Sequence, residues 1–418
     1  MSLKRFWLPF ISQLAPNISI VLTRLAAGTV SGQLQSVNPV VLAFSPSGQQ
    51  VTTTAMAFAV NLAAGTHTMR AYSSNSDSIT YINLMDVGVR GTEGDPDGTF
   101  DASRFVNLNY VNVSGGYVKK GIGTFGDAFY VRSGLLTNQP LDLSQVSAVR
   151  IFGDAGRWSS IVLPTDRSRL TYLNLGGNRM SGTFTAGSMP VLRELYLSSD
   201  QNLSRLTTIS VVDCPVLEVI DFGSNRTTSF LYTTAYLNKL RIFKARFAPF
   251  TGSAFANLTT LIDASRAATE YDLRECSLTA DEFTAVLDLL LTTPTGRPAA
   301  TGKMLRFEGV TVGQANEASV RQLERDKINT LSASNSWVVS FNRPTMNMQR
   351  ISGTTVRLTY TGTKDITIWA VGDTIRLSGR NGTTLALGDY QITAGSGKVW
   401  DIAANMTESA ATGVFDKI

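Results

Sequence analysis

The chain has 418 residues, enough for two or three folded units, because single hydrophobic cores stop growing at roughly 250–300 residues. The net charge is only +5 and the lysines and arginines are spread along the chain, so nucleic acid is not the expected partner. Two cysteines and one histidine exclude a disulfide framework and a zinc or iron site made from these side chains, and we expect no cofactor.

Residues 1–28 are expected to form an apolar N-terminal arm. Lys4 and Arg5 precede an apolar run, as in a secretory signal peptide, but Pro9 and Pro16 interrupt that run. We therefore expect an uncleaved arm that docks on a neighbouring subunit. No run in the sequence reaches the ~18–20 apolar residues that cross a bilayer, so no membrane span is expected.

Residues 29–78 are expected to form a β-rich cap. The segments PVVLAFSP, VTTTAMAFAV and HTMRAYSS have strand composition, and SPSGQQ and NLAAGT between them are turn-forming. A cap is needed because the first strand of a repeat array otherwise leaves an unpaired apolar edge.

Residues 79–345 are expected to form a repeat array with a helical C-terminal cap. Its clearest line, LTYLNLGGN, fits L-x-x-L-x-L-x-x-N with Leu170, Leu173, Leu175 and Asn178 in the four marked places. Further strands are predicted to start at Ile79, Leu108, Val146 (with Val149 and Ile151), Leu192, Leu217 and Leu240, and more weakly at Leu258 with Leu261. From Val146 onward the starts are 24, 22, 25, 23 and 18 residues apart, close to the roughly 20–29 residues of leucine-rich repeats.

A second apolar segment precedes several of these starts by about eight residues. These segments are TFDAS, IVLP, TFTAG, TISVV and SFLY. Each repeat is therefore predicted to contribute two short strands, one to each side of a flattened solenoid. The expected fold class is mainly β.

The array is expected to end in two strand–helix units. Thr279 and Glu282 have the spacing of a capping box, so a helix should begin near Ala280. The strand segments GKMLRFEG and SWVVSFN flank a second helix, whose apolar stripe is Val320, Leu323, Ile328 and Leu331. Residues 346–418 contain short strands joined by Gly- and Asn-containing turns, which predict a separate small β-barrel or β-sandwich domain.

The lines LTYLNLGGN, VLRELYLSS and VLEVIDFGSN resemble bacterial-type leucine-rich repeat proteins with two strands per turn, which occur in bacteriophage virions and on bacterial surfaces. The end of the array, with MLRFEG and WVVSF, is similar to that of phage-associated repeat proteins. The last unit, with VGDTIRLSG and VWDIA, looks like small β domains common in phage structural proteins. The resemblance implies the fold more strongly than it implies the function.

One glycine motif and two groups of acidic residues contain residue types that occur in cofactor, metal or catalytic sites. Gly121, Gly123 and Gly126 fit G-x-G-x-x-G, but the following DAFYVRSG does not predict the helix that a dinucleotide site needs, so we expect an inserted surface loop. Asp95, Asp97 and Asp101 lack the bidentate acid of a calcium loop and predict a turn and no metal site. Glu194 and Asp221 form a conceivable glycosidase pair, yet any repeat array offers such pairs, so no catalytic residue is expected.

Five further residues are expected to be structural. His67 follows Gly65 in a predicted turn and has no catalytic neighbour in the sequence. Cys214 and Cys276 are predicted to be buried small apolar side chains. Asn178 and Asn225 occupy the asparagine position of the repeat, where an amide can satisfy backbone groups of the turn.

The remaining candidate is a binding surface made by the residues between the inward-facing leucines. Ala148 is placed on this surface with Arg150, as are Val219 and Ile242 in later strands. The candidate contacts are Tyr110, Asn112, Arg150, Tyr172, Asn174, Glu194, Tyr196, Asp221 and Lys244. Tyrosine with mixed charge is typical of binding surfaces, although an ordinary solvated sheet face explains the same composition equally well.

We therefore expect a non-enzymatic bacteriophage virion protein, on the head or tail surface, that assembles with other virion proteins through its repeat face, its arm or its C-terminal β domain. A host-surface glycan or protein is a further candidate partner. The alternative is a bacterial cell-surface or secreted adhesion protein of the same fold.

Overall fold

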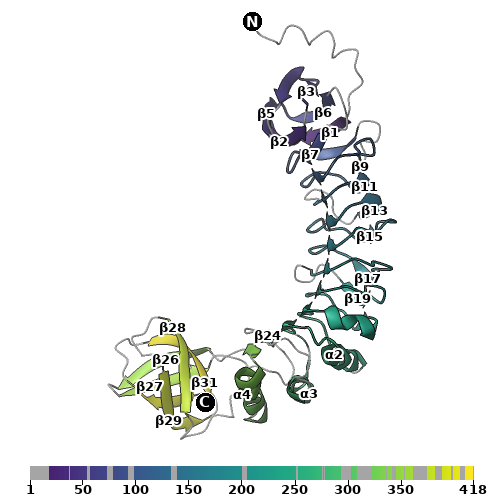
Figure 1. Cartoon of the computed structure of the whole chain (residues 1–418). Coiled ribbons are helices and arrows are strands. Elements are labelled where there is room, and N and C mark those ends of the chain that lie inside the picture. Colours follow the sequence, from purple (N-terminus) through teal and green to yellow (C-terminus); the bar gives the residue numbers. More distant parts are fainter. Residues whose placement is uncertain are drawn as a thin grey trace. The chain divides into compact units, whose positions relative to one another are not determined.

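The computed structural model is mainly β and divides into two compact units, Met1–Leu240 and Arg241–Ile418. The structure describes residues 18–36, 38–53, 57–72, 79–92, 98–132, 139–199, 205–250, 253–274, 276, 278–292, 303–307, 322–335, 337–340, 345–352, 354–360, 374–381, 388–396, 399–404 and 410–417. Each unit is described by itself below (Figure 1).

The first unit begins with an antiparallel sheet in the order β4-β3-β6-β1-β8. Its strands are β1 (Ile18–Arg24), β3 (Val40–Ser45), β4 (Gln49–Thr53), β6 (Gly65–Tyr72) and β8 (Val89–Thr92). Ile20 and Leu22 of β1 are fully buried between two neighbouring strands. The predicted arm is therefore too long, because residues 18–24 belong to the sheet; residues 1–17 lie outside the described part of the chain.

A second sheet of this unit runs in the order β5-β2-β7-β10-β12-β14-β16-β18-β20. Its strands are β2 (Gly28–Ser36), β5 (Ala57–Leu62), β7 (Ile79–Asn83), β10 (Tyr110–Asn112), β12 (Ala128–Tyr130), β14 (Arg150–Phe152), β16 (Tyr172–Asn174), β18 (Glu194–Tyr196) and β20 (Val219–Asp221). From β7 to β20 the strands are parallel, and β2 pairs antiparallel with β7. β2 and β5 thus cover the edge of the first parallel strand, and the segment HTMRAYSS lies in β6 of the other sheet.

Behind this main sheet lies a second layer made of two shorter parallel sheets. One contains β9 (Thr99–Asp101), β11 (Lys120–Thr124), β13 (Pro140–Ser147) and β15 (Ser160–Val162); the other contains β17 (Ser181–Thr185), β19 (Arg205–Ser210) and β21 (Ser229–Leu231). The chain alternates between the layers, so each sequence unit contributes a strand to both. The five predicted second segments all fall in this layer. The middle residues of the main strands, such as Leu173, Leu195 and Ile220, are fully buried.

Three details of the predicted periodicity were wrong. The segment containing Gly121, Gly123 and Gly126 is no inserted loop, because it forms β11 and β12 with Phe129 as the buried residue. The strand predicted from Val146, Val149 and Ile151 starts later, at Arg150, which leaves Ala148 buried and turns Phe152 outward. Leu258 and Leu261 lie in helix α2 (Ser253–Ala264) and not in a strand.

In the described part of the second unit, four parallel strands and three helices precede the terminal domain. The strands are β22 (Ile242–Lys244), β23 (Glu270–Asp272), β24 (Lys303–Arg306) and β25 (Trp337–Ser340), and the helices are α2, α3 (Ala280–Thr292) and α4 (Gln322–Asn335). The predicted capping box begins α3: Glu282 N donates to Thr279 Oγ1 at 3.2 Å, and Thr279 N donates to Glu282 Oε2 at 2.8 Å. In α4, Ile328 and Leu331 are buried; Val320 lies outside the described residues.

The terminal domain contains six antiparallel strands that pair in the order β26-β27-β30-β29-β28-β31, and β31 pairs back with β26. They are β26 (Thr345–Ser352), β27 (Thr355–Tyr360), β28 (Thr374–Asn381), β29 (Gly388–Ser396), β30 (Val399–Ala403) and β31 (Ala410–Lys417). Met348, Val356 and Ile402 are fully buried. On the exposed side, Arg357 and Asp401 face each other across β27 and β30 in a bidentate pair.

The turn after each main strand has a recurring left-handed residue. Ala155 (φ 52°) and Gly177 (φ 68°) occupy this position in consecutive turns. Each donates its backbone N–H to a carbonyl of the next turn, Gly176 at 2.7 Å and Ser198 at 2.6 Å. The left-handed conformation is found here even where the residue is not glycine, as at Ala155, at a strain of roughly 1–2 kcal/mol.

This turn gives a matched pair of predictions. Ala155→Gly should raise the free energy of unfolding by up to about 1 kcal/mol, because the strain of the left-handed alanine disappears. Gly177→Ala should lower it by more than that, since a Cβ at φ 68° would also lie 3.1 Å from the Ala155 Cα. Urea unfolding of both variants checks the two signs, and equal effects would contradict the turn argument.

Candidate binding face: an aromatic column across the main sheet

The main sheet of the first unit carries two rows of side chains on its outer face, of which Asn112 and Ala128 are buried. Successive strands pair without offset, for example Arg150 with Tyr172 and Phe152 with Asn174. The first row is Tyr81, Tyr110, Ala128, Arg150, Tyr172, Glu194 and Val219; the second is Asn83, Asn112, Tyr130, Phe152, Asn174, Tyr196 and Asp221. The structure thus brings the predicted contacts of this unit onto one face.

Six half-buried aromatic rings form a continuous column on this face. They are Tyr81, Tyr110, Tyr130, Phe152, Tyr172 and Tyr196, one from each strand from β7 to β18. Successive ring centroids are 4.4, 5.0, 4.1, 4.7 and 5.3 Å apart, close to the spacing of strands in a sheet. The column crosses from one row to the other, so it is not a simple ladder of equivalent positions.

The ring geometry decides what the column exposes. Tyr81 and Tyr110 stack at an interplanar angle of 6°, and Tyr130 and Phe152 stack at 4°. Their faces therefore cover each other, and a partner meets ring edges and phenol hydroxyls. Each stacked pair also stabilises its own position by about 0.5–1.5 kcal/mol, so the column is held in place before anything binds.

The tyrosines of the column are protonated hydrogen-bonding groups. Burial raises the pKa of Tyr110, Tyr130, Tyr172 and Tyr196 above the ordinary value for tyrosine. At Tyr196 the Glu194 carboxylate adds to this rise, because the hydroxyl donates to Glu194 Oε2 at 2.7 Å. These four tyrosines are therefore uncharged at neutral pH and can donate hydrogen bonds.

Three residues of the second row that were predicted to bind a partner instead form hydrogen bonds within their own turns. The side-chain oxygens of Asn112, Asn174 and Asp221 each accept the backbone N–H two residues ahead, at 3.0 Å in all three turns. Asn83 does the same at 3.2 Å. These side chains form the turns of the main sheet. In β12, β14 and β18 an aromatic residue occupies that position, so the second row contains both turn-forming residues and half-buried aromatic residues.

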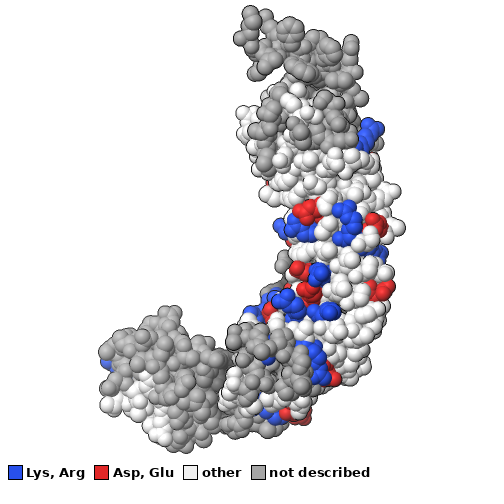
Figure 2. Space-filling model, in the orientation of Figure 1, with Lys and Arg blue, Asp and Glu red and all other residues white. Residues whose placement is uncertain are grey.

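Two ion pairs flank the middle of the column. Arg150 Nε donates to Asp127 Oδ1 at 2.9 Å, at the amino ends of β12 and β14. This hydrogen bond from Arg150 to Asp127 is the main cause that raises the pKa of Arg150. Arg132 Nε donates to Asp154 Oδ1 at 2.8 Å, at the carboxyl ends of the same strands. Figure 2 shows acidic and basic side chains interspersed over the visible face.

Lys244 belongs to the second unit, on β22. Its Nζ is 3.3 Å from Glu270 Oε1, and Glu270 Oε1 lies 3.9 Å from Arg306 Nε. On the same strand as Glu270, the buried Asp272 accepts hydrogen bonds from the Arg274 guanidinium at 2.8 and 2.6 Å. The main strands of the second unit therefore carry a charged network where the first unit carries rings.

Three rings of the column, those of Tyr81, Tyr130 and Phe152, are not among the binding residues predicted from the sequence. Tyr81 satisfies the same rule as the predicted contacts, since it lies between the inward residues Ile79 and Ile82. Tyr130 is predicted to face outward only if Phe129 is taken as the inward-facing residue of its strand. Phe152 is predicted to face outward only if the strand is taken to start at Arg150.

The asparagines predicted to be structural have the expected bonds. Asn178 Nδ2 donates to the carbonyls of Gly153 and Leu175 at 2.8 and 2.7 Å, and its Oδ1 accepts the N–H groups of Gly156 and Trp158. Asn225 Nδ2 donates to the carbonyls of Leu197 and Phe222, both at 2.9 Å. Leu170, Leu173 and Leu175 are buried beside Asn178.

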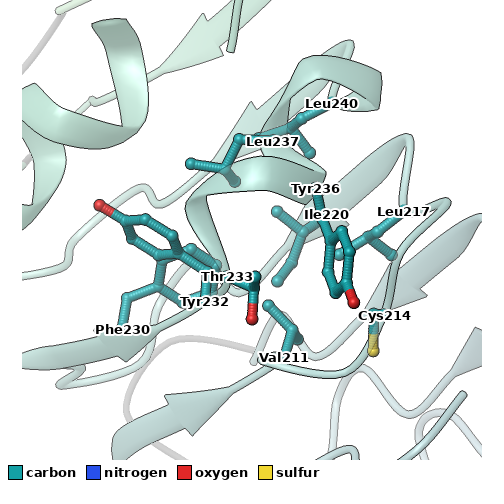
Figure 3. Close-up of a pocket in the computed structure, with 10 residues that line it drawn as sticks. All are labelled: Val211, Cys214, Leu217, Ile220, Phe230, Tyr232, Thr233, Tyr236, Leu237 and Leu240. Atoms are coloured by element: carbon teal, nitrogen blue, oxygen red, sulfur yellow. The ribbon is translucent and has the colours of Figure 1, made fainter. Parts of the chain in front are cut away.

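One small apolar pocket lies beside the 3₁₀ helix η2 (Thr234–Lys239) (Figure 3). It is lined by Val211, Cys214, Leu217, Ile220, Phe230, Tyr232, Thr233, Tyr236, Leu237 and Leu240 and has room for about one water molecule. Burial raises the pKa of the Cys214 thiol to about 12, so this thiol is protonated and unreactive at neutral pH. The pocket is too small for a substrate.

The other sequence motifs lie apart from the column. His67 is a buried residue of β6, not of a turn, and its Nε2 lies 2.9 Å from the Ala63 carbonyl oxygen. Cys276 is buried, and its Sγ contacts the Ala245 carbonyl at 3.2 Å. Asp101 accepts the Ser103 N–H in a turn; Asp95 and Asp97 lie outside the described residues. Glu194 and Asp221 lie in different rows of the face.

Within the described residues, no group of three His, Cys, Asp or Glu side chains is arranged to hold a metal ion. None of the helices described is both long and apolar enough to cross a membrane. The chain matches no family model, no curated protein and no solved structure at a significant level.

The Asp272–Arg274 pair predicts a pH dependence. Burial opposes ionisation of Asp272, but the hydrogen bonds and charge of Arg274 outweigh it and lower the pKa of the carboxyl group. Because the folded pKa lies below the unfolded value of ~3.9, the pair stabilises the fold fully above about pH 4 and this contribution is lost as the pH falls further.

At pH 7, Asp272→Asn should therefore lower the free energy of unfolding of the second unit by roughly 1.5–3 kcal/mol. The difference from the unchanged protein should shrink below about pH 4. Urea unfolding across a pH series measures it. The control is Asp263→Asn, which breaks the half-exposed pair with Arg266 and should cost under ~1 kcal/mol. A difference that is constant with pH would contradict the assignment.

Proposed function

We propose that this chain is a non-enzymatic structural protein of a bacteriophage virion, built on a leucine-rich repeat solenoid, and that it binds another protein of the particle through the aromatic column. The observation that carries the proposal is the column itself, six rings on one face of a periodic sheet.

The repeat assignment is supported by sequence and geometry together. The inward positions of the LTYLNLGGN line are buried, and Asn178 makes four hydrogen bonds with backbone groups of its own and the preceding turn. Each sequence unit supplies one strand to the main sheet and, from β9 to β21, one to the layer behind it. This is the behaviour expected of leucine-rich repeats with two strands per turn.

A binding role for the column is supported by its composition and rigidity. Tyrosine, phenylalanine and arginine are the residues most enriched in protein interfaces. Stacking holds the rings in fixed positions, so little side-chain entropy is lost when a partner covers them. The neighbouring ion pairs give the rim a mixed charge. A virion setting is supported by the likeness of the array end and of the last β domain to phage structural proteins.

The proposal that the chain is a virion protein is tested by mass spectrometry of purified phage particles. We expect the chain in the particles in a fixed ratio to the major structural proteins. Its absence there, with recovery in a bacterial envelope fraction, would instead support the alternative of a bacterial surface protein.

The role of the column is tested by Tyr172→Ala combined with Tyr196→Ala. The variant should enter particles at a level at least about tenfold lower, because two exposed interface rings are lost, and it should keep its cooperative unfolding. Quantitative mass spectrometry of particles gives the level, and circular dichroism checks the fold. Tyr236→Ala, which removes a half-buried tyrosine away from the column, is the control. Normal incorporation of the double variant would refute the role of the face.

A further inference from the structure

The centre of the column carries four charges in a symmetric arrangement. Along β12, Asp127 precedes the ring of Tyr130 and Arg132 follows it. Along the neighbouring parallel strand β14 the order is reversed, with Arg150 before the ring of Phe152 and Asp154 after it. Acid and base therefore alternate around the stacked pair of rings, which lie 4.1 Å apart.

The column has its midpoint at the same place. Three rings, Tyr81, Tyr110 and Tyr130, lie on one side of the line between β12 and β14, and three, Phe152, Tyr172 and Tyr196, lie on the other. Tyr110 and Tyr172 both belong to the first row, and Tyr130 and Phe152 both belong to the second. A rotation of half a turn about an axis along the strands thus exchanges these four rings pairwise, whereas the outermost rings, Tyr81 and Tyr196, belong to different rows.

We propose that the partner of this face is a second copy of the chain, docked face to face with the two columns antiparallel. The two-fold axis runs along the strands, between β12 and β14. Tyr130 of one copy then lies over Phe152 of the other, and Tyr110 lies over Tyr172. An interface of this kind uses the same patch on both copies and closes as a dimer.

The charges around the centre complement each other under this rotation. Asp127 of one copy faces Arg150 of the other, and Arg132 faces Asp154, so that four ion pairs connect the two copies. Each of these side chains is already paired within its own chain, and the dimer places every acid between two bases. No like charges of this set are opposed. The rings supply the contact area, and the charges fix the antiparallel orientation.

This inference uses the face on which the proposed function rests, and it names the occupant. A dimer brings the rings of both copies together along the middle of the interface, with the ion pairs on either side of the central rings.

The test is sedimentation equilibrium of the full chain at micromolar concentrations. The unchanged chain should dimerise. Asp127→Arg alone and Arg150→Glu alone should each raise the dissociation constant at least about tenfold, because like charges then meet across the axis. An equimolar mixture of the two variants should dimerise again, since Arg at 127 of one chain faces Glu at 150 of the other. This recovery cannot come from the ion pair within a chain.

The control is Arg193→Glu, which breaks an ion pair with Glu218 away from the centre and should leave dimerisation unchanged. A chain that stays monomeric, single variants that dimerise like the unchanged chain, or a mixture that stays monomeric would each overturn the proposal. A monomeric chain that still enters particles through Tyr172 and Tyr196 would keep the proposed function and refute only the second copy as its partner.

Discussion

The fold depends on hydrogen bonds between one sequence unit and the next. Most main strands of the first unit are only three residues long, so none can satisfy its backbone groups alone. Leu175 N donates to the Tyr196 carbonyl and Leu197 N to the Asp221 carbonyl, each in the following unit. Because buried backbone groups must be paired, every unit needs both neighbours. The cap formed by β2 and β5 at one end of the stack follows from this requirement.

The repeated strands of this fold can be predicted from the sequence where the inward-facing residues are leucines. Leu170, Leu173 and Leu175 mark β16 correctly, and the capping box marks the start of α3. The template fails where packing uses other side chains. In β12 the buried residue is Phe129, and Gly121 leaves the space into which that ring packs. The leucine template is read position by position, so it does not detect a ring that packs over a glycine of the neighbouring layer.

Only some residues of the candidate site could be predicted from the sequence. Alternation along a strand shows which residues face outward, and this places Tyr110, Tyr172 and Tyr196 correctly. It cannot show that Asn112 and Asn174 bend back onto their own turns, because a turn-forming asparagine and an exposed one look alike in sequence. The contact from Tyr110 to Tyr130 crosses between rows, so it depends on the exact register of two strands.

Pairing without offset makes the array modular. Removing one whole unit, from the start of one main strand to the start of the next, would leave every remaining side chain on the face it now occupies. During evolution the array can therefore gain or lose units without being redesigned. The centre of the column is less tolerant, because one added unit would move the midpoint by half a strand spacing and away from Asp127, Arg132, Arg150 and Asp154. If the proposed dimer forms, the number of units between β7 and β18 therefore fixes the match between the rings and these four charges.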